Sequence, residues 1–375
     1  MSDLQDRIQR HLDALVGSGV EAGLQVAVYQ NGVLIVDAVA GSADPVTGRP
    51  LTSGTPIFSF STGKNIAATL AHMLVARGFL GYDSLVTDHW PEFGVRGKAT
   101  TTLRHVLTHT TGLPAMPREI TPAELPDWSR VCAALAAAEP RRPPGTAMGY
   151  HAYTFGYLVG ELARRTTGRP MRELLREWIT TPLGIAGQLY FAAPPESLPE
   201  LARLEQRAER WPAVPDDDDA ILAPWESGPS ADFGNDGEIL RADIPSVGIS
   251  TARGLAAMFD ALLRGELVDS ARVGELSALA YEGVDQVFGT PARMALGFPL
   301  GRIGAPAEEN AEENAVEGAE EGAVAFGWPG GGGSYAYADP ARGVAFALTK
   351  TRLVPNFDTA LSVTTILSDH LARMA

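Results

Sequence analysis

The sequence predicts an α+β fold, an α/β sandwich in which both ends of the chain form one antiparallel sheet flanked by helices. Short strand-like runs occur near the start and again near the end, whereas residues from roughly 85 to 210 show mainly helical periodicity. We therefore expect one domain over residues 1–375, with a sheet region at 1–80 and 240–375 and a mainly helical region at 81–239.

The N-terminal elements are predicted to be a helix, a hairpin and a second helix. Apolar residues recur at helical spacing from position 4 to position 15, which is typical of an amphipathic helix. Two β-rich runs then surround Asn31-Gly32, a dipeptide that favours a two-residue hairpin turn. An alanine-rich apolar pattern predicts a further helix over residues 61–77.

The C-terminal part is predicted to return to the sheet. A helix is expected over residues 248–266, with Ser250 or Thr251 near its cap, and a closing helix at about 356–373. Short apolar runs between these two helices predict the strands that complete the sheet, at 292–300, 322–328, 334–339 and 343–350.

The composition is that of an ordinary soluble globular protein. The 375 residues are 45% apolar and 20% charged, which is sufficient for a sizeable core. A formal net charge of −15 at pH 7 argues against nucleic acids and anionic membranes as partners. Much of this charge lies at 215–220 and 307–323, and we expect the second segment to be an exposed loop between two strands.

The cysteine usage and the start of the chain favour a cytoplasmic location. Cys132 is the single cysteine, and its helical surroundings predict a small core residue rather than a reactive thiol. The first residues lack the basic and then apolar pattern of a secretory signal, and no apolar run is long enough to span a bilayer.

One stretch, FSFSTGKNIAATL at 58–70, raises the question of function, because Ser61 stands three places before Lys64. Ser61 could cap the helix, the Gly-Lys step could belong to a phosphate loop, or Ser61 and Lys64 could form a catalytic pair. The phosphate loop is excluded, because Phe58 and Asn65 occupy positions that require glycine and Ser or Thr. The chain also contains no Gly-x-Ser-x-Gly, which excludes the nucleophile turn of α/β-hydrolases.

The catalytic reading has a physical basis. Residues three apart share a helix face, so the Lys64 amine can lie beside the Ser61 hydroxyl. Serine is a weak nucleophile until a base takes its proton, and a desolvated lysine has a lowered pKa that suits it to this role. A helix N-terminus also favours developing negative charge.

Two further stretches contain possible partners. PGTAMGY ends in Tyr150 just before an apolar helix, and alone it could be a core tyrosine. GWPGGGGSYAYADP, at 327–340, has four successive glycines between strand-like runs, which leave the backbone open to a bound acyl group. Alone it could be a hairpin turn.

Together these motifs resemble the class C β-lactamase-like esterases, a branch of the serine β-lactamase and penicillin-recognising superfamily. Ser61-Thr62-Gly63-Lys64 is similar to the first family motif, PGTAMGY with Tyr150 to the second, and the glycine-rich stretch to the third. LRHVLTHTTGLP and GISTARGLAAM also resemble family stretches. The resemblance covers nearly the whole chain in the same order.

The resemblance implies roles for particular residues. Ser61 is similar in position to the acylated nucleophile, Lys64 to its partner, and Tyr150 to the acid or base that relays the proton to the leaving group. The backbone N–H groups of Ser61 and Gly331 are implied as the oxyanion hole. Whether Lys64 or Tyr150 holds the proton at rest stays open, and a cationic Lys64 would lower the pKa of Tyr150.

Two departures from the family's lactamases concern the substrate. Tyr-His-Ala at 150–152 replaces Tyr-x-Asn, and Trp-Pro-Gly at 328–330 replaces Lys-Thr-Gly. The amide and the cation that would bind a β-lactam are therefore missing, which favours an uncharged ester with an apolar acyl or alcohol part. The resemblance implies the following substrate-binding residues: Trp328, Gly330, His151 and Ala152.

A metal or cofactor is not expected. His105 and His109 are four residues apart, but the zinc-hydrolase pattern needs glutamate at position 106, which is Val106. His109 also falls in LTHTTGL, for which the resemblance implies a structural role near the site.

We therefore expect a cytoplasmic serine esterase that forms a covalent acyl-enzyme on a small-molecule ester. An acyltransferase would use the same residues, while a β-lactamase or D-Ala-D-Ala peptidase is disfavoured by the departures above. A non-catalytic binding protein is disfavoured because Ser61, Lys64 and Tyr150 are all present. Docking of a carrier protein would need a basic or apolar patch, and 139–144 and 162–169 are possible basic patches.

Overall fold

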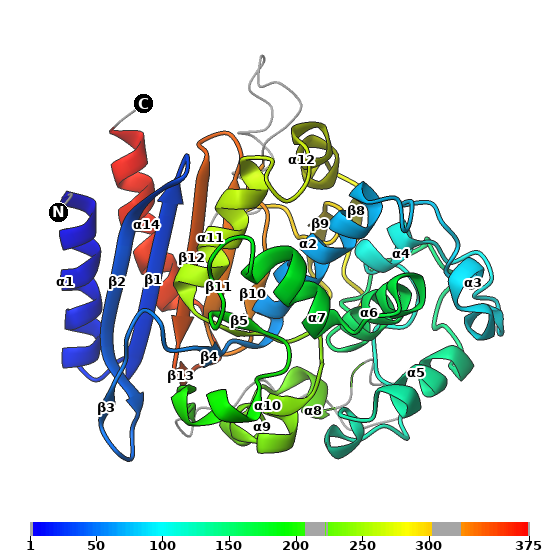
Figure 1. Cartoon of the computed structure of the whole chain (residues 1–375), viewed down its shortest axis with the longest axis horizontal. Helices are drawn as coiled ribbons and strands as arrows, with labels where there is room; N and C mark the ends of the chain where they lie inside the picture. Colours follow the sequence, from blue (N-terminus) through cyan, green and yellow to red (C-terminus); the bar gives the residue numbers. More distant parts are fainter. Residues whose placement is uncertain (1–2, 207–221, 223, 302–323, 374–375) are drawn as a thin grey trace.

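A computed structural model describes residues 3–206, 222, 224–301 and 324–373. Its main feature is a six-stranded antiparallel sheet in the order β10-β11-β12-β1-β2-β3 (Figure 1). The bounds of these strands are β1 Gly23–Gln30, β2 Val33–Asp44, β3 Arg49–Pro50, β10 Pro329–Gly330, β11 Ser334–Asp339 and β12 Val344–Lys350. Strands from the two ends of the sequence thus share one sheet, which confirms the predicted fold class.

The first strand of the first hairpin, β1, lies near the centre of this sheet. β1 pairs with β2 on one side and with β12 on the other, where Leu24 lies opposite Lys350. Asn31 and Gly32 form the predicted turn with φ of 49° and 86°, the positive values that a two-residue turn of this type requires.

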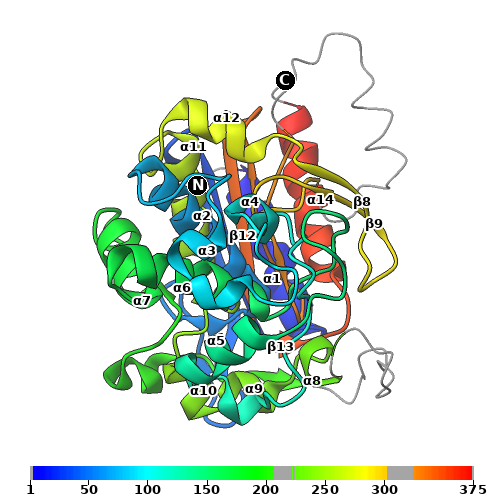
Figure 2. The ribbon, with the colours of Figure 1, turned by 90° about the vertical axis from the view of Figure 1, so that its right-hand side faces the viewer.

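Helices cover both faces of the sheet. α1 (Asp3–Gly17) and α14 (Asp358–Ala372) pack together on one face, and α11 (Ala252–Leu263) packs on the other. In Figure 1, α1 and α14 lie on one side of the strands and α11 on the other; in the turned view of Figure 2 they overlap the strands. These three helices confirm the predicted ones, and Thr251 caps α11 because its hydroxyl accepts the Gly254 N–H at 2.9 Å.

The buried helix α2 (Gly63–Ala76) connects the sheet to the helical region, where it contacts α6 and α7. That region contains α3 Val86–His89, α4 Leu103–Leu107, α5 Trp128–Ala137, α6 Thr154–Thr167 and α7 Met171–Leu175, with a π-helical turn at Arg176–Thr180. Further short helices are α8 Pro224–Ser227, α9 Ala231–Asn235, α10 Gly237–Arg241 and α12 Ser270–Ser277. The 3-10 turns are η1 Phe60–Thr62, η2 Pro91–Gly94, η3 Pro122–Glu124 and η5 Pro195–Glu200.

Three small sheets complete the fold. β4 Ile57–Phe58, β7 Ile249–Ser250 and β5 Leu189–Tyr190 form one, β6 Glu205–Gln206 and β13 Arg352–Leu353 another, and β8 Tyr281–Val284 with β9 Pro291–Met294 a hairpin. The hairpin turn, residues 285–290, lies beside the segment that carries Tyr150, because the Gln286 N–H donates to the Met148 carbonyl at 2.9 Å.

The described part of the predicted strand at 322–328 pairs less regularly than expected. Phe326 forms isolated antiparallel bridges, to Leu300 and Ala338, and the strand β10 begins only at Pro329. Both Phe326 and β10 lie antiparallel to β11, and a Cβ on Gly327 would lie 2.3 Å from the Ala336 carbonyl oxygen. The acidic stretches 215–220 and 307–323 lie outside the described residues.

No helix within the described ranges is both long and apolar enough to cross a bilayer.

Candidate active site

Ser61 lies in the tight turn η1, immediately before α2. Two backbone hydrogen bonds to Gly248 fix this turn: the Ser59 N–H donates to the Gly248 carbonyl at 2.7 Å, and the Gly248 N–H donates to the Phe60 carbonyl at 2.9 Å. Phe60 adopts a φ of 50°, an uncommon conformation for a residue with a side chain. The predicted alternative of Ser61 as helix cap is wrong, because Thr62 occupies the cap and the Ser61 hydroxyl bonds elsewhere.

Lys64 meets the Ser61 hydroxyl from the first turn of α2. Its Nζ lies 3.0 Å from Ser61 Oγ and donates to the carbonyls of Ala152 at 2.6 Å and Ser246 at 3.2 Å. Complete burial holds the pKa of Lys64 well below its usual value. A neutral amine has two N–H groups for the two carbonyls and one lone pair, which can accept the proton of Ser61.

Tyr150 completes the cluster. Its hydroxyl lies 2.6 Å from Ser61 Oγ, and Lys64 Nζ lies 4.9 Å from the centre of its ring. Burial raises the pKa of Tyr150, and the nearby Asp285 carboxylate raises it further. The expected lowering of this pKa by a lysine cation is wrong, because burial favours the uncharged form of Lys64 itself.

Two segments hold Tyr150 in place. On one side the His109 ring lies parallel to Tyr150, with centroids 5.8 Å apart, and also stacks on Phe155 at 4.8 Å. His109 Nδ1 accepts the backbone N–H of His151 at 2.9 Å. On the other side Asp285 Oδ1 accepts the backbone N–H of Tyr150 at 3.1 Å.

The glycine-rich turn between β10 and β11 lies directly against η1. A Cβ on Gly330 would lie 2.1 Å from the Ser59 carbonyl oxygen, so this contact requires glycine. The next residue, Gly331, has an amide that donates to no acceptor among the described residues. The turn therefore brings an available N–H group close to Ser61.

Trp328 precedes this turn and is fixed by polar contacts. Its backbone N–H donates to Asn65 Oδ1 at 2.7 Å, and its indole N–H donates to the Gly297 carbonyl at 2.7 Å. The ring lies 5.3 Å from that of Tyr150. Trp328 thus forms a nearly buried apolar wall where the lactamases of this family carry a cation.

Ser61 opens into a cavity of about 590 Å³ with mainly apolar walls. Its charged lining residues are Glu226, Asp285 and Arg293. Met148, Phe288, Ala292 and Pro229 are among its other lining residues.

Three of the four predicted substrate residues, Trp328, Gly330 and Ala152, line this cavity together with Ser61, Tyr150 and Gly331. His151 does not. The His151 side chain is fully buried, and this burial lowers its pKa to about 4. Its Nε2 lies 2.6 Å from Thr111 Oγ1, and its Nδ1 lies 2.5 Å from the Gly149 carbonyl oxygen. Its place is behind Tyr150.

Sequence reasoning missed Asp285, Phe288 and Asn65. Asp285 and a glycine stand between two alternating runs, which is a turn signal, but nothing in the pattern joins this turn to Tyr150. Asn65 follows the Ser-x-x-Lys motif directly and has no signal of its own. The contacts of Asp285 and Phe288 with Tyr150, and of Asn65 with Trp328, join segments far apart in the sequence, so a local pattern does not reveal them.

His105 and His109 are both engaged within the protein. His105 Nδ1 accepts the Thr102 N–H at 3.3 Å in the cap of α4, and His109 Nδ1 accepts from His151. In the parts of the chain that the structure describes, no three potential metal ligands come together.

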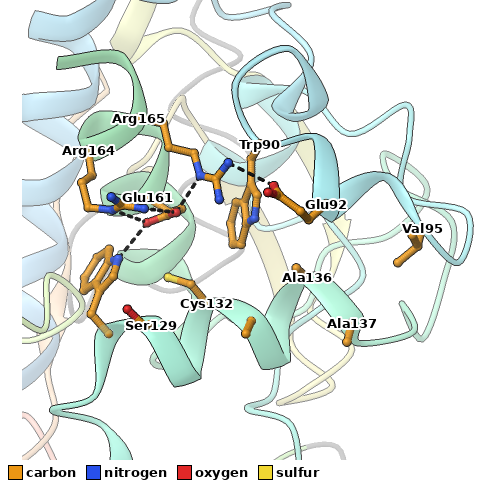
Figure 3. Close-up of a pocket in the computed structure, with 12 residues that line it drawn as sticks. Trp90, Glu92, Val95, Ser129, Cys132, Ala136, Ala137, Glu161, Arg164 and Arg165 are labelled. Carbon is orange, nitrogen blue, oxygen red and sulfur yellow. Dashed lines mark hydrogen bonds and ion pairs between the residues drawn. The ribbon is translucent and has the colours of Figure 1, made fainter. Parts of the chain in front are cut away.

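A second cavity, of about 440 Å³, lies between α5, α6 and η2 (Figure 3). There the buried Glu161 carboxylate accepts hydrogen bonds from Trp128 Nε1 at 2.7 Å and from Arg164 and Arg165. Cys132 lies buried beside it, and burial raises the pKa of its thiol. The predicted core role of this cysteine is confirmed, and two arginines of the basic run at 162–169 pair with a carboxylate of their own helix.

The fold and the site define a class of protein. The sequence matches the family described as Beta-lactamase over residues 8–369, so the chain belongs to the beta-lactamase family. The comparisons below confirm the predicted esterase branch of these serine hydrolases.

The chain is 36% identical to Esterase/beta-lactamase LipL of Mycobacterium tuberculosis (strain ATCC 25618 / H37Rv), over 88% of this chain and 77% of that protein. It is also similar to the crystal structure of a family VIII carboxylesterase, with a TM-score of 0.83, 29% identity and coverage of 95% of this chain and 94% of that one. EstA from Arthrobacter nitroguajacolicus Rue61a superposes with a TM-score of 0.84, at 26% identity, over 100% and 98% of the two chains.

Proposed function

We propose that this protein hydrolyses uncharged carboxylic esters through a covalent acyl-enzyme on Ser61. The observation that carries the proposal is the position of Ser61 Oγ, which lies 3.0 Å from Lys64 Nζ and 2.6 Å from the Tyr150 hydroxyl and faces an apolar cavity. Its relatives named as esterases support the same reaction class.

Acylation uses the three side chains in turn. Neutral Lys64 accepts the Ser61 proton as Oγ attacks the ester carbon, so the Oγ–carbon bond forms. The bond from this carbon to the alkoxy oxygen then breaks, and Tyr150 gives its phenolic proton to the leaving alkoxide. The proton held on Lys64 replaces the one that Tyr150 gave up.

Deacylation follows the same route with water in place of the alcohol. Water bonds to the acyl carbon and its proton passes to the Tyr150–Lys64 pair. The acyl carbon then separates from Ser61 Oγ, which recovers a proton. The free acid leaves and the resting state is restored.

The oxyanion formed in both steps needs donors. The Gly331 N–H, which has no acceptor among the described residues, and the Ser61 N–H are our candidates for this role. Removing one such donor costs about a hundred- to a thousand-fold in rate in other acyl-transfer enzymes.

The charges around the cavity support an uncharged substrate. Glu226 and Asp285 are buried carboxylates in its wall, and Arg293 forms an ion pair with Glu282 at 3.4 Å. Together with the Trp328 wall, these features disfavour a substrate carboxylate such as that of a β-lactam or a peptide C-terminus.

The test is the intact-protein mass after incubation with p-nitrophenyl acetate and, separately, with a fluorophosphonate. We expect one adduct per wild-type chain, mapped to Ser61 by peptide sequencing, and release of p-nitrophenol. Ser61→Ala should give neither, whereas Ser129→Ala, an exposed serine outside this cavity, should behave as the wild type. An adduct on another residue, or turnover by Ser61→Ala, would contradict the proposal.

An acyltransferase would share these residues and differ only in the acceptor of the acyl group. Added alcohol separates the two activities: formation of a new ester at the expense of free acid would show that the acyl-enzyme transfers its group.

A further inference from the structure

The β8–β9 hairpin forms one wall of the cavity, and its turn lies against Tyr150. The Phe288 ring lies 5.4 Å from the Tyr150 ring at an angle of 35°. Phe288 lines the cavity and is nevertheless 58% exposed. A large aromatic side chain beside the reacting atoms thus keeps much of its surface available for contact with another molecule.

The turn is held firmly enough to position this ring. Asp285 Oδ1 accepts the N–H groups of Tyr150 at 3.1 Å and of Val287 at 2.8 Å. Met148 N–H donates to the Tyr281 hydroxyl at 3.2 Å, and Gln286 N–H donates to the Met148 carbonyl at 2.9 Å. The hairpin and the segment that carries Tyr150 therefore form one unit.

Two groups in the cavity act on different parts of an ester bound to Ser61. The Gly331 amide is available in the cavity, and Pro229 packs against Gly331 so closely that a Cβ there would lie 2.5 Å from Pro229 Cγ. The Tyr150 hydroxyl, beside Phe288, holds the proton that the leaving alkoxide needs. The alkoxy oxygen must come within hydrogen-bond reach of the Tyr150 hydroxyl, so the alcohol group extends toward the hairpin.

We infer that Phe288, with Met148 and Ala292, forms the binding site for the alcohol part of the ester and favours a planar aromatic alcohol. The inference rests on the proposed esterase function and names its substrate class. An aromatic group stacked on Phe288 would keep its alkoxy oxygen beside Tyr150, and the buried Asp285 carboxylate would disfavour an anionic group there.

The test compares benzyl acetate with ethyl acetate, two esters that give the same acetyl-enzyme and differ only in the alcohol. In Phe288→Ala we expect kcat/KM for benzyl acetate to fall about three- to tenfold relative to ethyl acetate, the range of a lost aromatic contact. Phe288→Tyr, which keeps the ring, should restore the wild-type ratio. Val284→Ala, an exposed hairpin residue outside the cavity lining, should leave the ratio unchanged.

Transfer gives a second readout that does not depend on the leaving group. With ethyl acetate as donor and benzyl alcohol added, the acetyl-enzyme divides between water and the aromatic alcohol. We expect Phe288→Ala to form less benzyl acetate per acetic acid than the wild type, because the acceptor alcohol would occupy the same site.

The outcomes separate the two proposals. Equal losses for both esters would mean that Phe288 acts only by holding Tyr150, and no loss for either ester would mean that Phe288 does not contact the alcohol. Both results leave the ratio unchanged, and either overturns this inference alone. A wild-type protein that turns over neither ester and takes no fluorophosphonate would overturn the esterase function, and this inference with it.

Discussion

Lys64 is the residue whose surroundings decide the chemistry of the site. A lysine in water is protonated at neutral pH and cannot take a proton from serine. Here two backbone carbonyls, from Ala152 and Ser246, accept its N–H groups, and no carboxylate among the described residues is paired with it. Burial without a counter-charge favours the neutral amine, which is the form that a base requires.

The neutral Lys64 amine predicts how the esterase activity changes with pH. Since burial lowers the pKa of Lys64, activity should be present above that pKa and be lost as the pH falls through it and the amine becomes protonated. The other titratable groups facing Lys64 are Tyr150, with a raised pKa, and His109 and His151, with lowered pKa values, so none of them gains or loses charge near neutral pH.

The measurement is kcat/KM for an uncharged ester between pH 5 and pH 9. Wild type should lose activity on the acid side with a slope of one proton, and Lys64→Arg, which stays charged, should be at least a hundredfold slower throughout. Activity that rises as the pH falls would contradict a neutral-lysine base.

At the scale of elements, the site depends on how closely β10 approaches η1. Gly330 allows this approach, because a Cβ would lie 2.1 Å from the Ser59 carbonyl oxygen. The neighbouring Gly331 amide and the Ser61 hydroxyl are therefore placed by the contact between two elements rather than by either alone.

Gly330→Ala should separate the two elements and lower kcat/KM by about a hundred- to a thousand-fold, the effect of losing one oxyanion donor. Gly274→Ala is the control: this glycine lies in α12, nothing lies within 4 Å of the position of its Cβ, and helix propensity favours alanine. The two variants should be compared by ester turnover and by circular dichroism. Full activity in Gly330→Ala would show that this contact does not place the Gly331 donor.

Features that are set within a few residues could be predicted from the sequence, whereas contacts between distant segments could not. The turn at Asn31-Gly32 and the Thr251 cap were predictable because both are set within a few residues. Ser61 and Lys64 could be proposed as a pair because residues three apart share a helix face and because the surrounding motifs resemble those of a known family. Asp285 was not, because its contact with Tyr150 joins segments 135 residues apart and depends on how the hairpin packs.

At the scale of the whole molecule, one buried ion pair ties the ends of the chain together. Lys350, at the end of β12, donates to the Glu21 carboxylate just before β1, and the Thr359 hydroxyl of α14 donates to the same oxygen at 2.6 Å. Both charged side chains are almost fully buried. This lysine therefore supports the sheet and is not a substitute for the cation missing at Trp328.

Lys350→Met should lower the free energy of unfolding by about 3 to 5 kcal/mol, because it leaves the Glu21 carboxylate buried without a partner. In the double variant with Glu21→Gln most of this loss should be recovered, since no unpaired charge remains. Urea unfolding measures the wild type, Lys350→Met, Glu21→Gln and the double variant. Asp3→Asn at an exposed ion pair should change the free energy of unfolding by less than about 1 kcal/mol. Additive losses in the double variant would show that the two charges are not coupled.

The central position of β1 has a consequence for how the protein is made. This strand is synthesised before the helical region, whereas its partner β12 ends at Lys350 and is synthesised only after that region. Until then one edge of the nascent hairpin is an open row of backbone donors and acceptors that neighbouring nascent chains could pair with. Folding of the sheet therefore waits until β12 has been translated, and the rate of elongation sets how long that edge stays unprotected.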